Sequence, residues 1–348
     1  MSESRPLEEQ SRIIEHPENL VEVKDLKKWF PVQKGFLDQF LARRVDYVHA
    51  VDGVTFNIRR GEAFGLAGES GSGKSTIGRL VIGLEQPTEG KVCFDGVDLT
   101  SLHDESLRRM RKRMQVIFQD PMASLNPRMT IGESISHGLR IHISGTAEQH
   151  RETTMTIMEK VGLVPSRFFY NKYPHQISGG QRQRVAIARA LVTLPELILA
   201  DEPIAMADVS VRSLLLDLMI RLKQELDLTY LFITHDLATA KYICDRIAIL
   251  YLGKIMELGD LKDVYSLPLH PYTRALLAAV PVPDPDKRRT VPMPPGEIPN
   301  PINPPPGCRF YPRCPTAKDI CATDEPPLRE LRPGHFVACY YAEDFLAS

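Results

Sequence analysis

The stretch that decides the fold is residues 63–77, Ala-Phe-Gly-Leu-Ala-Gly-Glu-Ser-Gly-Ser-Gly-Lys-Ser-Thr-Ile. Its first five residues are short and apolar, which predicts a buried strand, and a helical pattern begins at Ser75. Between them the turn fits G-x-x-x-x-G-K-[ST], in which backbone N–H groups surround phosphates, the lysine adds charge and the hydroxyl contacts Mg²⁺. We therefore predict a phosphate loop for ATP or GTP, formed by Gly68, Glu69, Ser70, Gly71, Ser72, Gly73, Lys74, Ser75 and Thr76.

Polar side chains follow two further apolar runs. Residues 197–200 end in Asp201 and Glu202, and residues 230–234 end in His235. In a phosphate-loop protein, an acid at the end of a neighbouring parallel strand can reach Mg²⁺, and this role fits Asp201. Glu202 is predicted to be the general base for an attacking water. His235 could contact the γ-phosphate or orient that base, although a single histidine at a strand end is more often structural.

The rest of the chain alternates strand-like and helix-like segments, which predicts an α/β core with a parallel sheet. Residues 1–19 are expected to be a disordered leader without a signal peptide, and residues 31–46 are a segment with mixed signals. No apolar run approaches the roughly 20 residues of a membrane-spanning helix. Basic and acidic residues number 43 and 44, so the composition gives no indication of nucleic-acid binding.

The C-terminal part differs in composition. Sixteen of the 28 prolines lie between Pro281 and Pro333. Four of the six cysteines also lie in the C-terminal part, from Cys308 to Cys339, spaced C-x₅-C-x₆-C-x₁₇-C, which matches neither common zinc motifs nor ferredoxin runs. Four thiolates from one chain can still complete a metal site, so these cysteines are candidate ligands: Cys308, Cys314, Cys321 and Cys339.

The segment 177–181, Ile-Ser-Gly-Gly-Gln, decides the class of protein. Ser178 can cap the following helix and form a capping box with Gln181, and Gly179 and Gly180 leave backbone N–H groups open to a phosphate. The segment resembles the LSGGQ signature of ATP-binding-cassette (ABC) ATPases. The resemblance implies a cassette of RecA-like parallel-sheet core, antiparallel β subdomain and helical subdomain, the last at about residues 120–192.

Further cassette motifs follow in order. Gln119 matches the Q-loop residue that contacts Mg²⁺ and water, and His235 matches the switch histidine. Phe30, or with less support Trp29, falls where the family places the aromatic that stacks on adenine. Asp208 is the retained aspartate of the D-loop, whose usual serine and leucine are both alanine here. The resemblance implies an ATPase dimer in which the Ser178 segment of one chain completes the phosphate site of the other.

Several longer runs narrow the resemblance to the ATP-binding subunits of oligopeptide/dipeptide importers: residues 27–36, 118–135, 270–281 and 307–321. By this resemblance a cassette at 20–268 precedes an extension at 269–348, whose four cysteines hold a [4Fe–4S] cluster, with zinc or free thiols as the alternatives. The implied partners are a second, related ATPase, two permeases and an extracytoplasmic binding protein, with the chain at the cytoplasmic face of the plasma membrane. Oligosaccharides, nickel or another small solute are alternative cargoes, and a soluble ABC ATPase of repair or translation is a distant alternative.

Overall fold

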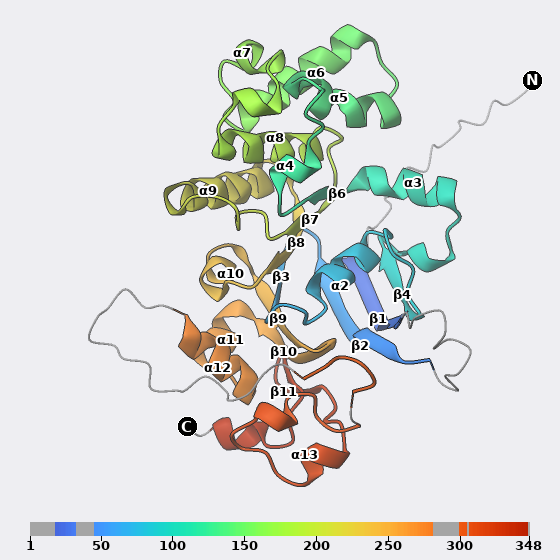
Figure 1. Ribbon diagram of the computed structural model, residues 1–348, viewed down its shortest axis with the longest axis vertical. Coiled ribbons are helices and arrows are strands. Elements are labelled where there is room, and N and C mark those ends of the chain that lie inside the picture. The colour runs from blue at the N-terminus through green and yellow to red at the C-terminus, as the bar shows by residue number, and fades with distance from the viewer. Residues whose placement is uncertain (1–17, 33–44, 281–298, 305, 347–348) are drawn as a thin grey trace, which may run out of the picture.

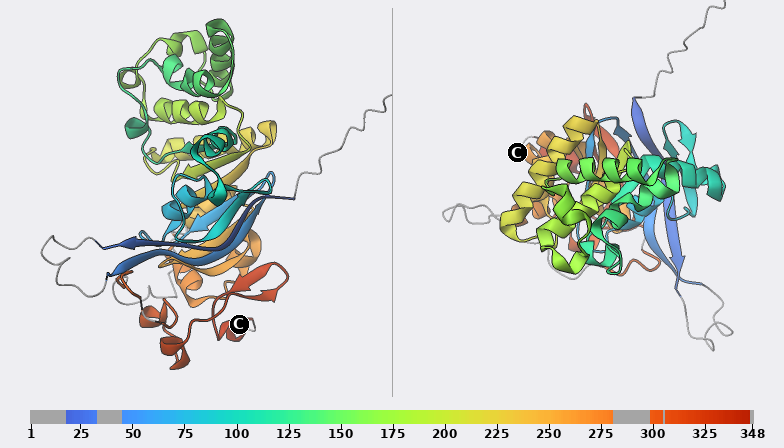
Figure 2. Two further views of the ribbon diagram at one scale, coloured as in Figure 1. Left: turned by 90° about the vertical axis from the view of Figure 1, so that its right-hand side faces the viewer. Right: turned by 90° about the horizontal axis from the view of Figure 1, so that it is seen from above.

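The computed structural model describes residues 18–32, 45–280, 299–304 and 306–346. A helical subdomain stands at one end of the molecule, a mixed sheet occupies the centre and the C-terminal extension closes the other end (Figure 1). The turned view in Figure 2 shows the N-terminal strands crossing in front of that central sheet. The predicted leader lies outside the described residues except at its end, and so does most of the segment with mixed signals.

The main sheet has the order β11-β12-β10-β9-β3-β8-β7-β6. Its middle strands pair in parallel, and β9 turns back into antiparallel β10 at Gly253. Because parallel strands are covered on both faces, most of them are fully buried. The strands are β3 (Ala63–Ala67), β6 (Met114–Ile117), β7 (Leu197–Asp201), β8 (Thr229–Thr234), β9 (Arg246–Tyr251), β10 (Lys254–Asp260), β11 (Arg329–Arg332) and β12 (His335–Val337).

A second, antiparallel sheet has the order β2-β1-β4-β5. One core joins it to the main sheet, with Phe56 and Phe64 stacked at 5.1 Å between ring centroids. The α/β architecture with an antiparallel subdomain is thus confirmed. The strands are β1 (Asn19–Pro31), β2 (Tyr47–Arg59), β4 (Glu89–Phe94) and β5 (Val97–Asp98).

Helices cover both faces of the main sheet and build the predicted helical subdomain, α4 to α8 (Figure 1). The α-helices are α2 (Lys74–Val81), α3 (Asp104–Arg113), α4 (Pro121–Ser124), α5 (Ile131–His142), α6 (Ala147–Lys160), α7 (Ser166–Tyr170), α8 (Gly179–Leu191), α9 (Val209–Leu226), α10 (Leu237–Ile243), α11 (Leu261–Ser266), α12 (Pro271–Ala279) and α13 (Ile320–Thr323). Four short 3₁₀ turns lie at η1 (Leu99–Ser101), η2 (Pro174–Gln176), η3 (Tyr311–Arg313) and η4 (Ala342–Phe345).

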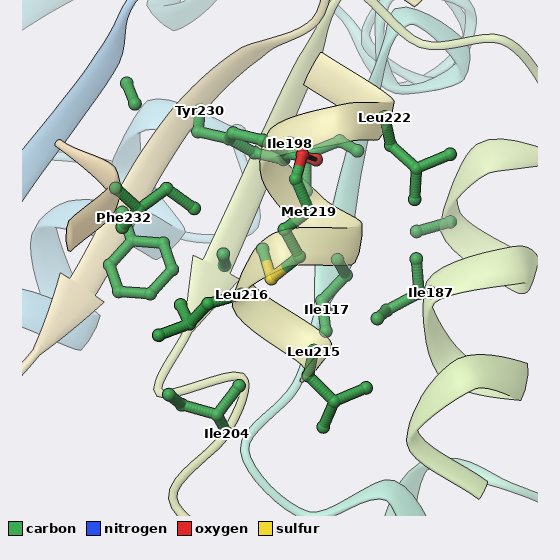
Figure 3. Packing of buried hydrophobic residues seen from close by; sticks show 14 of the residues in the cluster. Ile117, Ile187, Ile198, Ile204, Leu215, Leu216, Met219, Leu222, Tyr230 and Phe232 are labelled. Carbon is green, nitrogen blue, oxygen red and sulfur yellow. Dashed lines mark hydrogen bonds between the residues drawn. The ribbon is translucent and has the colours of Figure 1, made fainter. Parts of the chain in front are cut away.

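Helix α9 provides much of the packing that joins the sheet to the helical subdomain (Figure 3). Leu215 and Met219 recur one turn apart and are fully buried. They lie among Ile187 of α8, Ile198 of β7 and Phe232 of β8. The strand ends that carry the polar residues are therefore held between a rigid sheet and a packed helix.

The C-terminal extension is joined to the cassette through a buried carboxylate. Glu257 of β10 accepts hydrogen bonds from the backbone N–H groups of Leu269 and His270, at 2.8 and 3.0 Å. His335 of β12 lies 2.7 Å from the same carboxylate through Nε2, and β12 pairs with β10. Because this carboxylate is fully buried and these donors satisfy it, the extension packs as part of the main sheet.

We expect the buried His270 to make stability pH-dependent. Burial lowers its pKa to about 4 from an ordinary 6.5, and its Nδ1 accepts the N–H of Tyr272 at the start of α12. The unfolded chain therefore binds the extra proton, so this stability is present above about pH 6.5 and is lost as the pH falls toward about 4. In His270→Asn the new side chain still accepts the capping hydrogen bond but does not titrate. The free energy of unfolding of this variant, measured in denaturant, should therefore fall less between about pH 7 and pH 5 than that of the wild type. The exposed His137→Asn is the control, and equal slopes in all three proteins would contradict the prediction.

Candidate nucleotide-binding site

The phosphate loop lies between β3 and α2, as its sequence predicts. Gly73 has a φ of 103°, and a side chain there would collide with the carbonyl oxygen of Ala50. Lys74 is buried, and its Nζ donates to the carbonyl oxygens of Gly68 and Glu69, both at 2.8 Å. Desolvation lowers the pKa of this lysine, although nearby carboxylates oppose the shift. The loop thus holds a buried cation on its own carbonyls, in reach of an incoming phosphate.

Two oxygen side chains meet beside the loop. Ser75 Oγ donates to Asp201 Oδ1 at 3.1 Å, across 126 positions of sequence. Burial raises the pKa of Asp201, so a cation at this point would relieve the cost of its desolvated charge. Hydroxyl and carboxylate oxygens are ligands that Mg²⁺ prefers, so these two residues fit that ion. Bound here, Mg²⁺ would neutralise charge on the phosphate oxygens.

The three residues predicted to be catalytic lie in one hydrogen-bonded group. The Glu202 carboxylate accepts from Gln119 Nε2 at 2.8 Å, and its other oxygen lies 2.8 Å from His235 Nδ1. Glu202 has a φ of 47°, an uncommon conformation for a residue with a side chain. Its N–H donates to Ile233 O at 3.0 Å, which ties it to the neighbouring strand. The carboxylate is therefore held in place while His235, 59% exposed, remains accessible.

A cavity of about 540 Å³ brings most of these residues together. A volume of this size fits a nucleotide-sized ligand. Beyond the predicted residues, Pro301 from the C-terminal extension lies on its wall. The lining consists of Val48, Ala50, Ser70, Gly71, Gly73, Lys74, Ser75, Thr76, Gln119, Glu202, His235 and Pro301.

The signature segment does not reach this cavity. Ser178 caps α8 through the predicted capping box: its Oγ accepts from Gln181 N at 3.3 Å, and Gln181 Oε1 accepts from Ser178 N at 2.9 Å. Ser178 and Gly179 are exposed, and neither they nor Gly180, Gln181 or Asp208 lines the cavity. Figure 1 shows α8 in the helical subdomain, apart from α2, which follows the phosphate loop. One chain therefore presents the two halves of the predicted site on separate surfaces.

The two candidate adenine-stacking aromatics differ in their contacts. Trp29 stacks on His49 at 4.4 Å between centroids, and its Nε1 donates to Asp52 at 3.0 Å. Phe30 is 38% exposed and contacts Lys28, whose Nζ lies 5.0 Å from the ring centroid. The indole already has a stacking partner, and neither Trp29 nor Phe30 lines the cavity, so stacking of Phe30 on adenine stays a prediction.

Sequence reasoning missed the contact between the extension and the phosphate loop. Arg313 donates to both carboxylate oxygens of Glu69, at 2.7 and 3.2 Å, and Glu69 N donates to Tyr272 Oη at 3.0 Å. Near Pro301, the bridge between Val48 and Ile302 ties the extension to β2. No local pattern in the sequence marks this contact, because Arg313 is one of several basic residues in the tail. The extension therefore supports the nucleotide site directly.

We expect Arg313→Met to weaken ATP binding through this contact. The variant leaves the Glu69 carboxylate without its two charge-assisted hydrogen bonds, so the loop loses part of its support. KM for ATP should rise by about five- to tenfold, with a smaller change in kcat, because a hydrogen bond to a charged group contributes about 1.5–3 kcal/mol and only part of this reaches the nucleotide through the loop. Steady-state ATPase assays measure this, with the exposed Arg332→Met of the same extension as the matched control. An unchanged KM in a folded Arg313→Met protein would contradict the prediction.

The structure corrects the prediction of a metal site on the cysteines. Cys308, Cys314, Cys321 and Cys339 do line one small pocket, but all are free and no group of His, Cys, Asp or Glu in the described residues is arranged to hold a metal ion. Burial raises the pKa of Cys308 to about 12 and of Cys339 to about 11, so these thiols are neutral in the structure described. Neutral thiols that pack against the apolar core explain their density. The predicted [4Fe–4S] cluster is therefore wrong, and the zinc alternative fails for the same reason.

Comparison with known proteins assigns the family. Residues 51–205 match the ABC transporter family, and residues 256–321 match the C-terminal region of oligopeptide/dipeptide transporters. The oligopeptide transport ATP-binding protein AppF of Bacillus subtilis is 48% identical over 93% of this chain and 97% of its own length. The chain belongs to the ABC transporter ATPase family. OppF of Salmonella typhimurium is 46% identical over 94% of this ABC ATPase and 97% of its own length. A putative peptide import ATP-binding protein of Brucella ovis is 54% identical over 83% of this chain and 90% of its own length.

Solved structures confirm the cassette fold of this ABC ATPase. The cassette MJ0796, in a dimeric post-hydrolysis state with ADP and phosphate, superposes with a TM-score of 0.61 at 31% identity, over 69% of this chain and 98% of that one. CbiO1 of Clostridium perfringens superposes with a TM-score of 0.61 at 26% identity, over 72% of this chain and 92% of that one. ABC ATPases of this type bind and hydrolyse ATP as pairs of ATPase subunits and act with membrane permeases. In the described residues, this ABC ATPase has no helix that is long and apolar enough to cross a membrane.

Proposed function

We propose that this ABC ATPase hydrolyses ATP at sites shared between two ATPase subunits and thereby powers the import of peptides. The observation that carries the proposal is the divided site. The phosphate loop and the Gln119–Glu202–His235 group line one cavity, whereas the exposed Ser178 segment lies on another surface of the same chain. A second ATPase subunit can supply its own Ser178 segment to this cavity. The backbone N–H groups of that segment lie at the start of a 13-residue helix, where they can bind a phosphate.

The roles within the site follow from its contacts. Glu202 is the general base, since one carboxylate oxygen can accept a proton from water while Gln119 and His235 hold the group in position. Lys74 binds the β- and γ-phosphates. The residues that would hold Mg²⁺ are Ser75, Asp201 and Gln119. The remaining proposed ATP contacts are Phe30, Gly68, Glu69, Ser70, Gly71, Ser72, Gly73, Thr76, Ser178, Gly179, Gly180, Gln181 and Asp208.

A surface beside Gln119 is proposed as the permease contact. Phe118 and Met122 are 45% and 46% exposed and flank the residue that contacts Glu202. Large exposed apolar side chains are typical of protein interaction sites. A partner that docks beside Gln119 can also shift the hydrogen bond that Gln119 donates to Glu202. The proposed assembly has two permeases, a second and non-identical ATPase, and an extracytoplasmic binding protein. The chain would then be peripheral, at the cytoplasmic face of the plasma membrane.

Peptides are the proposed cargo. The match of residues 256–321 to the C-terminal region of oligopeptide/dipeptide transporters supports this choice, as do the peptide-transport names of the relatives. Oligosaccharides, nickel and other small solutes remain the alternatives for the same architecture, because the cargo is bound by other chains of the assembly.

Co-purification from membranes tests this function. The tagged chain, extracted in mild detergent, should retain two permeases and a second ATPase, and reconstituted assembly should take up labelled peptide only with ATP. Phe118→Asp should release the permeases, whereas Val164→Asp at another exposed apolar position should not. Recovery of ribosomes or DNA without permeases would refute the transport function, and uptake of sugar or nickel in place of peptide would refute the cargo.

A further inference from the structure

Three apolar residues line the nucleotide cavity: Val48 and Ala50 of β2, and Pro301 of the C-terminal extension. All its other lining residues belong to the phosphate loop or to the predicted catalytic group. Those residues suit the phosphates and the attacking water, which leaves the three apolar residues for the base and ribose of a nucleotide. The position of β2 therefore determines the shape of the nucleoside part of the site.

β1 and β2 pair beside this cavity, and the two faces of the pair differ. Phe30 lies opposite Val48, and Trp29 lies opposite His49. Because successive residues of a strand point to opposite faces, Phe30 shares the face of Val48, and the other two residues share the opposite face. On that opposite face the rings of Trp29 and His49 stack at 4.4 Å between centroids. The face that is turned away from the nucleotide cavity thus carries an aromatic pair.

Asp52 of β2 joins this aromatic pair. Its carboxylate accepts from Trp29 Nε1 at 3.0 Å and lies 3.4 Å from His49 Nδ1. The pairing with β1 shifts register at Ala50, and this shift brings Asp52 to the face of His49 although the two are three positions apart. The aromatic pair and the strand that lines the cavity are therefore held by one carboxylate.

The C-terminal extension binds the same carboxylate through Arg309. Nη2 of Arg309 donates to Asp52, and Lys254 Nζ lies 3.8 Å from it. Burial acts to raise the pKa of Asp52, but Lys254, His49 and Arg309 outweigh it, so this pKa is lowered and the group is charged. Both Asp52 and Arg309 are 7% exposed. Removal of either partner would leave a buried charge without compensation, so the pair ties the extension firmly to β2.

The extension contacts β2 a second time, at the cavity itself. Val48 and Ile302 form an antiparallel bridge, and the N–H of His49 donates to Pro301 O at 3.1 Å. Pro301, which lines the cavity, is therefore fixed to the strand that supplies the other two apolar residues. Together with the Arg309 contact, this holds β2 to the extension at two points.

We propose that Asp52 is a positioning residue, through which the C-terminal extension sets the nucleoside part of the ATP site. Asp52 does not line the cavity, so it acts through the strand that it holds. The inference rests on the proposed function, because it takes this cavity to be the site of ATP. It gives Arg309 a role separate from that of Arg313, which contacts Glu69 of the phosphate loop.

Isothermal titration calorimetry of the full-length chain with ATP and with inorganic tripolyphosphate, both with Mg²⁺, tests the proposal. In Arg309→Met the Kd for ATP should rise by about five- to tenfold. The Kd for tripolyphosphate, which has no base or ribose, should change by less than about twofold. Asp52→Asn should show the same difference between the two ligands. Arg313→Met should weaken both, because it acts on the phosphate loop, and the exposed Arg332→Met should weaken neither.

Trp29 is the only tryptophan of the chain, so its fluorescence reports on the group around Asp52. ATP should change its emission in the wild type, whereas tripolyphosphate should not, and equal responses to the two would contradict the proposal. Equal weakening of ATP and tripolyphosphate in Arg309→Met, or unchanged ATP affinity in this variant, would overturn the positioning role and leave the ATP site standing. A wild type that binds no ATP would refute the proposed function and this inference together.

Discussion

Glu202→Gln is expected to reduce steady-state ATP hydrolysis by about 10²-fold or more while ATP binding remains close to that of the wild type. A positioned general base contributes about 10²–10⁴-fold to the rate of proton transfer steps, so its removal should dominate the kinetics. The amide that replaces the carboxylate has almost the same shape but cannot accept the proton of the attacking water.

The contacts of Glu202 explain why binding should survive. Lys74, Ser75 and the loop backbone hold the phosphates in our proposal, and none of them depends on the charge of Glu202. An amide at this position can still bond with Gln119 or His235, at the 2.8 Å separations that the carboxylate now makes. It also removes a negative charge near the γ-phosphate. ATP should therefore accumulate unhydrolysed and keep two ATPase subunits together.

Three measurements check this expectation. Phosphate release under multiple turnover gives the rate, titration with a fluorescent ATP analogue gives Kd, and gel filtration with ATP reports the paired state. Glu225→Gln, an exposed carboxylate on α9, is the control and should behave as the wild type. If Glu202→Gln hydrolysed ATP at the wild-type rate, another group would be the base.

The parts of this fold that sequence predicts are those set by local patterns. The strand predicted at residues 63–67 has the same bounds as β3, because a turn on one side and the phosphate loop on the other fix both ends of this apolar run. The cap at Ser178 was equally predictable, since both partners of a capping box lie within four residues. The strand-end positions of Asp201, Glu202 and His235 follow from the same reasoning, and the parallel pairing of β7, β8 and β3 brings them to one edge.

The parts that sequence could not predict depend on contacts between distant residues. β6 has only four residues, too few for a local pattern to specify a strand, and its pairing with β7 determines its conformation. Arg313 and Glu69 are 244 positions apart, so no local pattern connects them. The cysteine error has the same origin: spacing gives the number of thiols, whereas the arrangement of side chains in space decides whether they can hold a metal ion, and no such group is present in the described residues.

Lys74→Ala is expected to remove most of the affinity for ATP. Lys74 is the buried cation of the loop, and its Nζ already donates to Gly68 O and Glu69 O at 2.8 Å. Alanine leaves those carbonyls without their donor and leaves the phosphates without the positive charge that would balance them. Because a hydrogen bond to a charged group contributes about 1.5–3 kcal/mol, Kd should rise by about 10- to 100-fold.

The comparison of the two variants separates binding from chemistry. Lys74→Ala should lose affinity for the fluorescent ATP analogue, whereas Glu202→Gln should keep it and lose only turnover. Lys91→Ala, an exposed lysine on β4, controls for the general loss of a positive charge, and circular dichroism checks that the Lys74 variant is folded. Undiminished ATP affinity in a folded Lys74→Ala protein would count against the phosphate loop as the nucleotide site. That result would also remove the basis for placing Glu202 beside the γ-phosphate, because both assignments depend on the same cavity.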